Sequence, residues 1–187
     1  VAAARAWWLL RRGGIDVRVL DGGIRAWAEA GLPLEQGDIR PAAGDVSLPV
    51  TSGGVLTRDE VERFPAGGVL LDVRTPEQYS GARTSVAPVG GHIPGAVNLP
   101  ALATTTSDGR LHDPETLTRI FASAGVVPGR SVAVYCGSGV ASMHTALALG
   151  EIGIDAQVYP GSWSEWAHSR GRPVAVGILP RGRLTRV

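Results

Sequence analysis

The sequence contains one cysteine, Cys136, in a chain of 187 residues, and it contains no lysine, since all 18 basic residues are arginine. A single cysteine excludes an internal disulfide framework and a CxxC metal site. The four histidines are scattered without the spacing of metal ligands, so we expect no bound metal. A free thiol survives best in a reducing compartment, which favours the cytoplasm.

The chain also lacks an excess of charge of either sign and lacks long hydrophobic runs. Its 18 basic and 17 acidic residues give a net charge of +1 at pH 7, which argues against nucleic acid or an anionic membrane as the main partner. No apolar run reaches the length of a membrane span, and no secretory signal is visible. We therefore expect neither nucleic acid nor a membrane among the partners.

Methionine is nearly absent as well, because the only one is Met143. We therefore expect the chain to be N-terminally incomplete, as a fragment or a processed product. Its length allows one full α/β domain plus part of another.

An internal repeat supports this division of the chain. The segment GIDVRVLDGGIRAWAEAGLPL, from Gly14, resembles GIDAQVYPGSWSEWAHSRGRPV, from Gly153, and both close on Gly-x-Pro. We infer two homologous domains in tandem. Seven aligned positions are identical, namely Gly14/Gly153, Ile15/Ile154, Asp16/Asp155, Val19/Val158, Gly22/Gly161, Trp27/Trp166 and Ala28/Ala167.

The repeat predicts which part of the first domain is present. The alignment places Val1 on Val140, so the counterpart of Cys136 would precede the first residue. A single strand cannot form a sheet with two covered faces. We therefore expect a missing N-terminal segment as a partner, supplied by a separate piece of chain or by another molecule. The remnant should consist of a helix, a strand and a helix, at about residues 2–11, 17–20 and 24–30.

Two domains are predicted: residues 1–45, the remnant of a first domain plus linker, and residues 46–187, a complete domain with a basic tail. Residues 31–54 are rich in Pro, Gly and Asp and read as the linker. Strands separated by helices indicate an α/β fold with a doubly wound parallel sheet. The tail, residues 180–187, reads as a flexible basic end. Strands are expected at 69–73, 132–135 and 156–159, and helices after Thr57 and at 113–124, 142–149 and 163–168.

Cys136 directly follows one of these strands, where such sheets place their ligands. The glycines after it permit a tight loop, and a helix begins beyond them. Unpaired N–H groups and a helix N-terminus favour negative charge, and so favour the thiolate, which is the nucleophile. The alternative is a small buried side chain at a strand end. The expected anion cradle is formed by Gly137, Ser138, Gly139, Val140, Ala141 and Ser142.

Four motifs together resemble the rhodanese-like sulfurtransferases, over nearly the whole chain. CGSGVAS, from Cys136, is similar to the active loop of that family, and LDVRTPEQY, from Leu71, to its DxR…Y segment. GHIPGAVNLP, from Gly91, and GSWSEW, from Gly161, are similar to two further signatures. The resemblance identifies a tandem-domain member of the thiosulfate and 3-mercaptopyruvate sulfurtransferase type.

The resemblance implies covalent, ping-pong catalysis. Cys136 would attack the sulfane sulfur of a small donor and become a persulfide, and cyanide, a thiol or reduced thioredoxin would then accept the sulfur. No cofactor or metal is implied. Asp72, Arg74 and His92 are interpreted as supports of the active loop, with structural roles favoured over catalytic ones.

The donor is less defined by the sequence. Gly137 and Ser138 match the loop of mercaptopyruvate-preferring relatives, but Gln78 stands where relatives often carry an arginine. Arg83 is the only candidate for the arginine that holds a donor carboxylate. Losing one cationic anchor should weaken the binding of an anionic donor.

Two other classes of function remain open. Cell-cycle phosphatases of the same fold need an arginine in a C-x5-R loop, and Ser142 occupies that position here. Without a guanidinium the loop cannot clamp a phosphate bidentately. A non-catalytic binding or regulatory module is the third possibility, although such modules usually lack the cysteine that this chain keeps.

Overall fold

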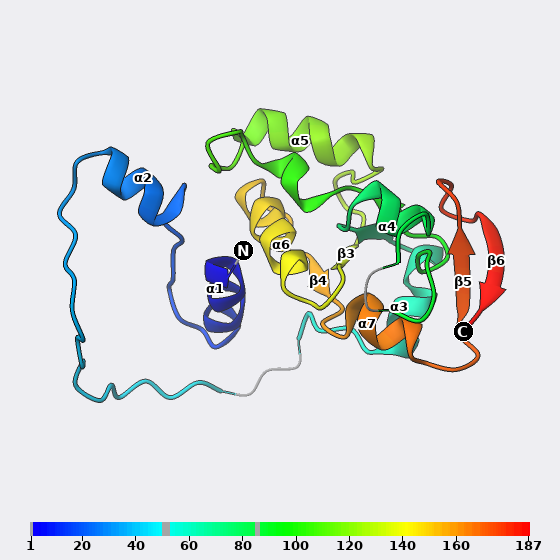
Figure 1. Cartoon of the computed structure of the whole chain (residues 1–187), viewed down its shortest axis with the longest axis horizontal. Helices are drawn as coiled ribbons and strands as arrows, with labels where there is room; N and C mark the ends of the chain where they lie inside the picture. The colour runs from blue at the N-terminus through cyan, green and yellow to red at the C-terminus, as the bar shows by residue number, and fades with distance from the viewer. Residues whose placement is uncertain (1, 50–52, 85–86) are drawn as a thin grey trace.

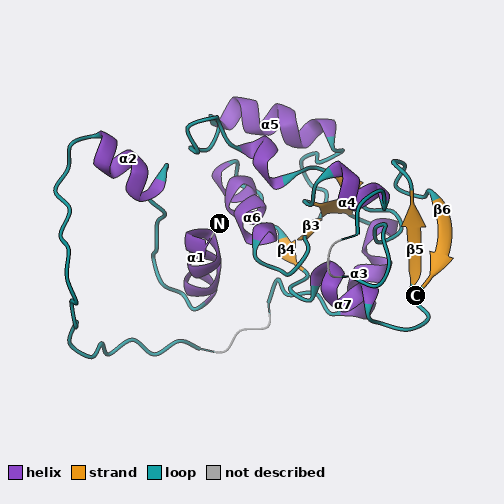
Figure 2. Cartoon of the chain, in the orientation of Figure 1, coloured by secondary structure: helices purple, strands orange, loops and turns teal. Residues whose placement is uncertain are grey.

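The computed structural model describes residues 2–49, 53–84 and 87–187. Its centre is a four-stranded parallel sheet in the order β2-β1-β3-β4. Figures 1 and 2 show β3 and β4 beside α6. All three pairings are parallel, with Leu71 opposite Val134 and Val134 opposite Val158. The strands are β1 (Val69–Asp72), β2 (Val97–Asn98), β3 (Val132–Tyr135) and β4 (Gln157–Val158). The predicted parallel α/β sheet is confirmed.

Side chains of the central strands alternate between two cores, one on each face of the sheet. Leu71 and Val134 point to a core closed by helices α5 (Pro114–Ser123) and α6 (Ala141–Glu151). Leu70 and Tyr135 point to a second core, closed by α3 (Arg58–Arg63) and α7 (Ser162–Ala167). Both β1 and β3 are buried along their full length, as apolar strands covered on both faces must be.

Local sequence signals explain where the helices begin. Thr57 and Glu60 form the expected capping box of α3. Asp113 accepts the N–H of Thr116 at the start of α5. A third cap was not anticipated: Thr75 caps the short helix α4 (Pro76–Ser80). Short 3-10 turns complete the connections, at Phe64–Ala66 (η1) and Ala101–Thr104 (η2).

The interpretation of residues 180–187 as a flexible end was wrong. Strand β6 (Arg183–Arg186) pairs antiparallel with β5 (Pro173–Val176). The β6 side chains are exposed, so backbone pairing with β5 holds this strand and side-chain burial does not. Ala175 of β5 also bridges His92, which connects the hairpin to the rest of the domain.

The N-terminal segment packs its first helix against the domain. Helix α1 (Ala2–Arg12) buries Trp7 and Trp8 in the same core as α6. Under the alignment of the repeat, α1 has the same bounds as α6, and α2 (Gly23–Glu29) begins where α7 begins. The structure therefore repeats a helix on each side of residues 17–20 and of β4, and the first helix of each pair lies before the repeated sequence.

The strand expected at residues 17–20 is not formed. Val17 and Val19 are half-buried against the core while Arg18 and Leu20 are exposed, which is a strand-like alternation. A strand needs a neighbour to satisfy its backbone groups. The equivalent β4 pairs with β3, whereas the described residues pair no strand with 17–20. The expected partner segment, and the domain division with it, stay predictions.

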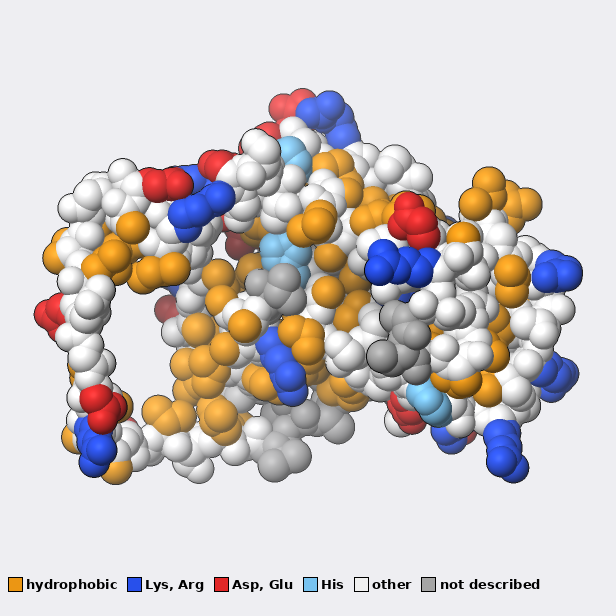
Figure 3. Space-filling view, viewed as in Figure 1, with side chains coloured by type: hydrophobic (Ala, Val, Ile, Leu, Met, Phe, Trp, Pro, Cys, Tyr) orange, Lys and Arg blue, Asp and Glu red, His pale blue; other side chains and the backbone are white. Residues whose placement is uncertain are grey.

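Residues 31–49 are exposed throughout and carry no helix or strand, as expected for a linker. Residues 50–52 of the predicted linker lie outside the described residues. Figure 3 shows an opening between the linker and the body of the molecule, with hydrophobic side chains on its borders. Large exposed hydrophobic residues of this part of the chain are Leu9, Leu20, Ile24, Leu32, Leu34, Ile39, Val46 and Leu48.

Candidate active site

Cys136 lies at the carboxyl end of β3, in the loop that leads into α6. Its side chain is 3% exposed. The N–H of Gly139 donates to Cys136 Sγ over 3.1 Å. Gly139 has a φ of +81°, and a Cβ at this position would collide with the carbonyl oxygen of Pro160. The sequence therefore needs glycine here, both for the backbone conformation and for the close approach.

The predicted cradle is partly seen. Of the loop N–H groups in the described structure, that of Gly139 is bonded to Sγ. Ser138 is exposed and Gly137 half-buried, and α6 begins at Ala141. Ser142 is fully buried in the first turn of α6, and its hydroxyl has no hydrogen-bond partner among the described residues. The roles of the other cradle residues stay predictions.

The first residues of α7 support the Cys136 loop from outside. The N–H of Trp163 donates to the Cys136 carbonyl oxygen over 2.9 Å. The N–H and the hydroxyl of Ser164 both donate to the Gly137 carbonyl oxygen, over 2.9 and 2.7 Å. Ser162 accepts the N–H of Cys136 over 3.1 Å. The sequence interpretation missed this contribution of Ser162 and Ser164, although the GSWSEW motif was the signal for it.

Asp72 and Arg74 form a buried ion pair at the end of β1. Arg74 Nη2 lies 2.6 Å from Asp72 Oδ2 and also donates to the Gly91 carbonyl oxygen over 2.7 Å. Burial acts to lower the pKa of Arg74, but the charge and hydrogen bonds of Asp72 outweigh it and raise that pKa. The Arg74 guanidinium lies 4.5 Å from the ring centroid of Trp163, whose backbone holds the Cys136 carbonyl. This geometry is consistent with loop support.

Tyr135, the residue before Cys136, is tied to the same pair. Its hydroxyl donates to Asp72 Oδ2 over 2.6 Å and accepts the N–H of Ile93 over 3.1 Å. Burial, and then the Asp72 carboxylate, raise the pKa of Tyr135 well above its usual value, so the hydroxyl keeps its proton. The ion pair therefore fixes the end of β3 from which the Cys136 loop starts.

His92 is fully buried and bonded to backbone. Its Nδ1 lies 2.9 Å from the Tyr79 carbonyl oxygen, and its Nε2 lies 3.3 Å from that of Pro180. The ring stacks on the Tyr79 ring with centroids 3.7 Å apart. Burial lowers the pKa of His92, which favours the neutral ring. These contacts agree with a structural role and leave His92 no exposed face to act as a base.

Gln78 and Arg83 are the two positions that bear on the anchoring of an anionic donor. Gln78 Oε1 accepts the N–H of Thr75 and so closes the cap of α4. Arg83 is exposed, and its backbone N–H donates to the Glu77 carbonyl oxygen. Within the described residues, Arg83 makes no hydrogen bond or ion pair with the Cys136 loop. The role of Arg83 in holding a donor carboxylate stays a prediction.

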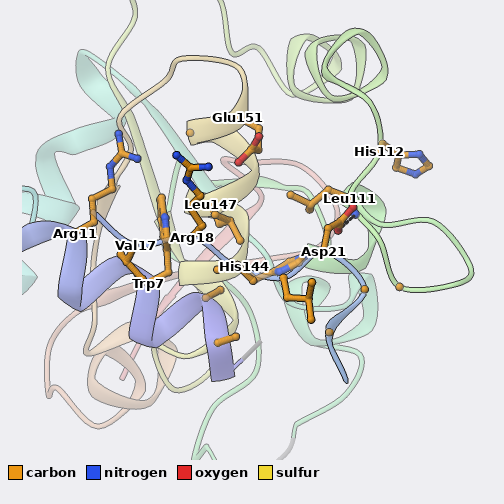
Figure 4. A pocket seen from close by; sticks show the side chains of 18 of the residues that line it. Trp7, Arg11, Val17, Arg18, Asp21, Leu111, His112, His144, Leu147 and Glu151 are labelled. Atoms are coloured by element: carbon orange, nitrogen blue, oxygen red, sulfur yellow. Dashed lines mark hydrogen bonds between the residues drawn. The ribbon is translucent and has the colours of Figure 1, made fainter. Parts of the chain in front are cut away.

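A cavity of about 790 Å³ lies next to α6, and Cys136 does not line it. Figure 4 shows side chains around it from α1, from residues 17–21, from α6 and from the turn before α5. Its wall includes His144, whose Nε2 lies 3.4 Å from Thr104 Oγ1. Because the only thiol and its hydrogen-bond donors lie outside this cavity, we place the chemistry at the Cys136 loop.

Within the described ranges, no group of three or more His, Cys, Asp or Glu side chains could hold a metal ion. Over the same ranges, none of the helices has the length and hydrophobicity needed to cross a membrane.

Comparison with known proteins adds a family to this geometry. Residues 57–169 match the family model described as "Rhodanese-like domain". "Putative thiosulfate sulfurtransferase SseB" of Mycobacterium tuberculosis is 41% identical over 179 residues, covering 94% of this chain and 63% of that protein. "Probable 3-mercaptopyruvate sulfurtransferase" of Pseudomonas aeruginosa is 39% identical over 189 residues, covering 94% of this chain and 64% of that protein. The chain thus spans less than two thirds of these relatives.

The fold has a counterpart among solved structures. The crystal structure of YnjE superposes with a TM-score of 0.85 at 27% identity. The superposition covers 94% of this chain and 46% of YnjE. The covered share exceeds the residues 57–169 that the family model matches, so the likeness extends beyond that part of the chain.

Proposed function

The chain belongs to the family of rhodanese-like domains, and on that premise we propose that it is a sulfurtransferase that carries sulfur as a persulfide on Cys136. The observation that carries the proposal is the hydrogen bond from Gly139 N–H to Cys136 Sγ, 3.1 Å long, in a loop at the end of a parallel strand. A hydrogen-bond donor held at the sulfur favours the thiolate, which is the nucleophilic form of cysteine.

The reaction has two halves. The Cys136 thiolate attacks the outer sulfur of the donor, a new S–S bond forms, and the donor remnant leaves with the electron pair of the broken bond. Thiosulfate would leave as sulfite and 3-mercaptopyruvate as pyruvate. A thiophilic acceptor then attacks the outer sulfur of the persulfide and restores the Cys136 thiolate. Cyanide, a small thiol and reduced thioredoxin are the acceptors we propose. No cofactor enters either half.

The loop and the relatives support a proposal for the sulfur donor. Gly137 and Ser138 add no positive charge next to Cys136, which favours a donor less dependent on cations than thiosulfate. The named relatives include both a thiosulfate and a 3-mercaptopyruvate sulfurtransferase. We propose 3-mercaptopyruvate as the better donor, in the reducing cytoplasm where Cys136 stays a thiol.

The experiment is intact-mass spectrometry after incubation with each donor separately. A gain of one sulfur atom that is reversed by cyanide or dithiothreitol, and is absent from Cys136→Ser, would support the proposal. The donor that loads faster identifies the preferred substrate. Ser123→Ala is a matched control for handling, because it changes an exposed serine of α5 that bonds the Ile120 carbonyl and leaves the Cys136 loop intact. Absence of any mass gain with either donor in the folded protein would contradict the proposal.

A phosphatase is the alternative of the same fold, and the site argues against it. Ser142 stands where the phosphate-clamping arginine is needed, and it is fully buried at the start of α6. Hydrolysis of a generic aryl phosphate that is lost in Cys136→Ser would revive this alternative. A non-catalytic module would show neither sulfur loading nor hydrolysis.

A further inference from the structure

The sulfur of Cys136 lies near two donors from different elements. One is the N–H of Gly139, in the loop after β3. The other is the hydroxyl of Ser162, the first residue of α7, whose Oγ is 3.9 Å from Sγ. Ser162 is fully buried, so water does not compete for its hydroxyl.

The Ser162 hydroxyl has one proton and two acceptors within reach. Its oxygen already accepts the N–H of Cys136 over 3.1 Å. Its proton can go to the Tyr159 carbonyl oxygen, 2.9 Å away, or to Cys136 Sγ. A hydroxyl donates only one hydrogen, so these two bonds exclude each other at any moment. The choice between them depends on the charge of the sulfur, because a hydrogen bond to an ionised acceptor is about twice as strong.

The backbone at Ser162 supports a role for the hydroxyl. Ser162 has a φ of +52° and is the only non-glycine residue with positive φ in the described chain. Such a conformation is costly for a residue with a Cβ and persists only where neighbouring contacts impose it. Here the contacts are the bonds from Trp163 to the Cys136 carbonyl and from Ser164 to the Gly137 carbonyl. Glycine would adopt this φ without strain, so what serine adds at this position is its hydroxyl.

We propose that Ser162 is a switching donor, whose hydroxyl points to Tyr159 while Cys136 is a neutral thiol and turns to Sγ when the sulfur is ionised. This rests on the proposed function in taking Cys136 as the nucleophile. Together Ser162 and Gly139 then hold the negative sulfur from two elements, and the start of α7 becomes part of the active site.

The test is the pH dependence of alkylation by iodoacetamide, which reports on the thiolate and needs no sulfur donor. Cys136 is the only cysteine, so the whole signal comes from it. In Ser162→Ala and in Ser162→Gly, alkylation should shift to higher pH, with a rate at neutral pH roughly tenfold below wild type, as expected for one lost hydrogen bond to a charged group. Ser123→Ala should follow wild type, because Ser123 is exposed on α5 and its hydroxyl bonds the Ile120 carbonyl and no residue of the Cys136 loop.

The two variants at position 162 separate the hydroxyl from the strain. Ser162→Gly relieves the backbone, so it keeps the test open should Ser162→Ala fail to fold. An unchanged pH profile of alkylation in both folded variants would overturn the proposal. A wild-type profile in Ser162→Gly together with a shifted one in Ser162→Ala would also overturn it, because backbone geometry and not the lost hydroxyl would then cause the shift. A wild-type protein that is alkylated at neutral pH but never gains sulfur would contradict the proposed function and leave the role of Ser162 standing.

Discussion

The guanidinium of Arg74 and the carboxylate of Asp72 meet at 2.6 Å, with side chains only 6% and 0% exposed. Both groups have further partners, since Asp72 accepts the Tyr135 hydroxyl and Arg74 donates to the Gly91 carbonyl. One buried pair thus connects the ends of β1 and β3 with the segment that follows Gly91. The Cys136 loop starts from this junction.

Removing one partner of this pair should be costly. Asp72→Ala leaves the Arg74 charge buried without its carboxylate, so we expect the free energy of unfolding to fall by about 3–5 kcal/mol. Urea denaturation followed by circular dichroism measures it. Glu29→Ala is the matched control, because the Arg25–Glu29 pair is 55% and 63% exposed and its loss should cost at most about 0.5 kcal/mol. Equal losses in the two variants would show that the buried pair does not stabilise the junction.

Much of the fold could be predicted from the sequence, because local signals and burial agree there. The apolar runs of β1 and β3 are covered on both faces, and Thr57 and Asp113 cap helices as their types suggest. Cys136 and the loop could be placed for the same reason, since glycines after a buried strand define the turn.

The wrong predictions share one cause: strand pairing and side-chain contacts depend on residues that are distant in the sequence. Residues 17–20 have the pattern of a strand and remain a loop because the described residues offer them no neighbour. Residues 183–186 have exposed arginines and still form a strand, because β5 supplies the neighbour. Ser162 was missed for a related reason: its hydroxyl reaches Cys136 across 26 positions of sequence, and only the fold brings them together.

The C-terminal hairpin predicts slow hydrogen exchange in a segment that looks flexible by composition. Val187 makes two backbone hydrogen bonds with the segment before β5. Its N–H donates to the Arg172 carbonyl, and its carbonyl accepts the N–H of Gly171. Deuterium exchange followed by mass spectrometry should show protection of a peptide covering 183–187. The internal comparison is a peptide from residues 35–49, which are exposed and unpaired and should exchange at once. Equally fast exchange in both peptides would refute the hairpin in solution.

The buried ring of His92 predicts a loss of stability in mild acid. Burial lowers the pKa of His92 in the folded state, so the unfolded chain binds a proton more readily than the folded one. The contribution of His92 to the free energy of unfolding is therefore fully present above the ordinary histidine pKa of 6.5, and it is lost as the pH falls below that value. Burial also lowers the pKa of His144, so protonation of His144 should add to the same loss of stability at low pH.

Urea denaturation at about pH 7.5 and about pH 5.5 tests this. Wild type should be less stable at the lower pH, and His92→Gln should lose less stability between the two values, because its side chain cannot titrate. The exposed His168 provides a control, since His168→Gln should keep the wild-type difference. A His92→Gln variant with an undiminished pH dependence would assign the effect to other groups.

Gly139 gives the sharpest test of the Cys136 loop. A Cβ at this position would collide with the Pro160 carbonyl oxygen, and alanine would have to adopt the φ of +81° that Gly139 has. Gly139→Ala must therefore displace either the loop or the turn after β4. Sulfur loading of Cys136 should be lost, and the free energy of unfolding should fall by about 1–3 kcal/mol. Gly153→Ala isolates the backbone cost, because Gly153 has a φ of +76° and nothing within 4 Å of its Cβ position. That variant should lose only about 1 kcal/mol and load sulfur normally. If Gly139→Ala loads sulfur as fast as Gly153→Ala, the close approach of the loop to Pro160 does not matter for the reaction.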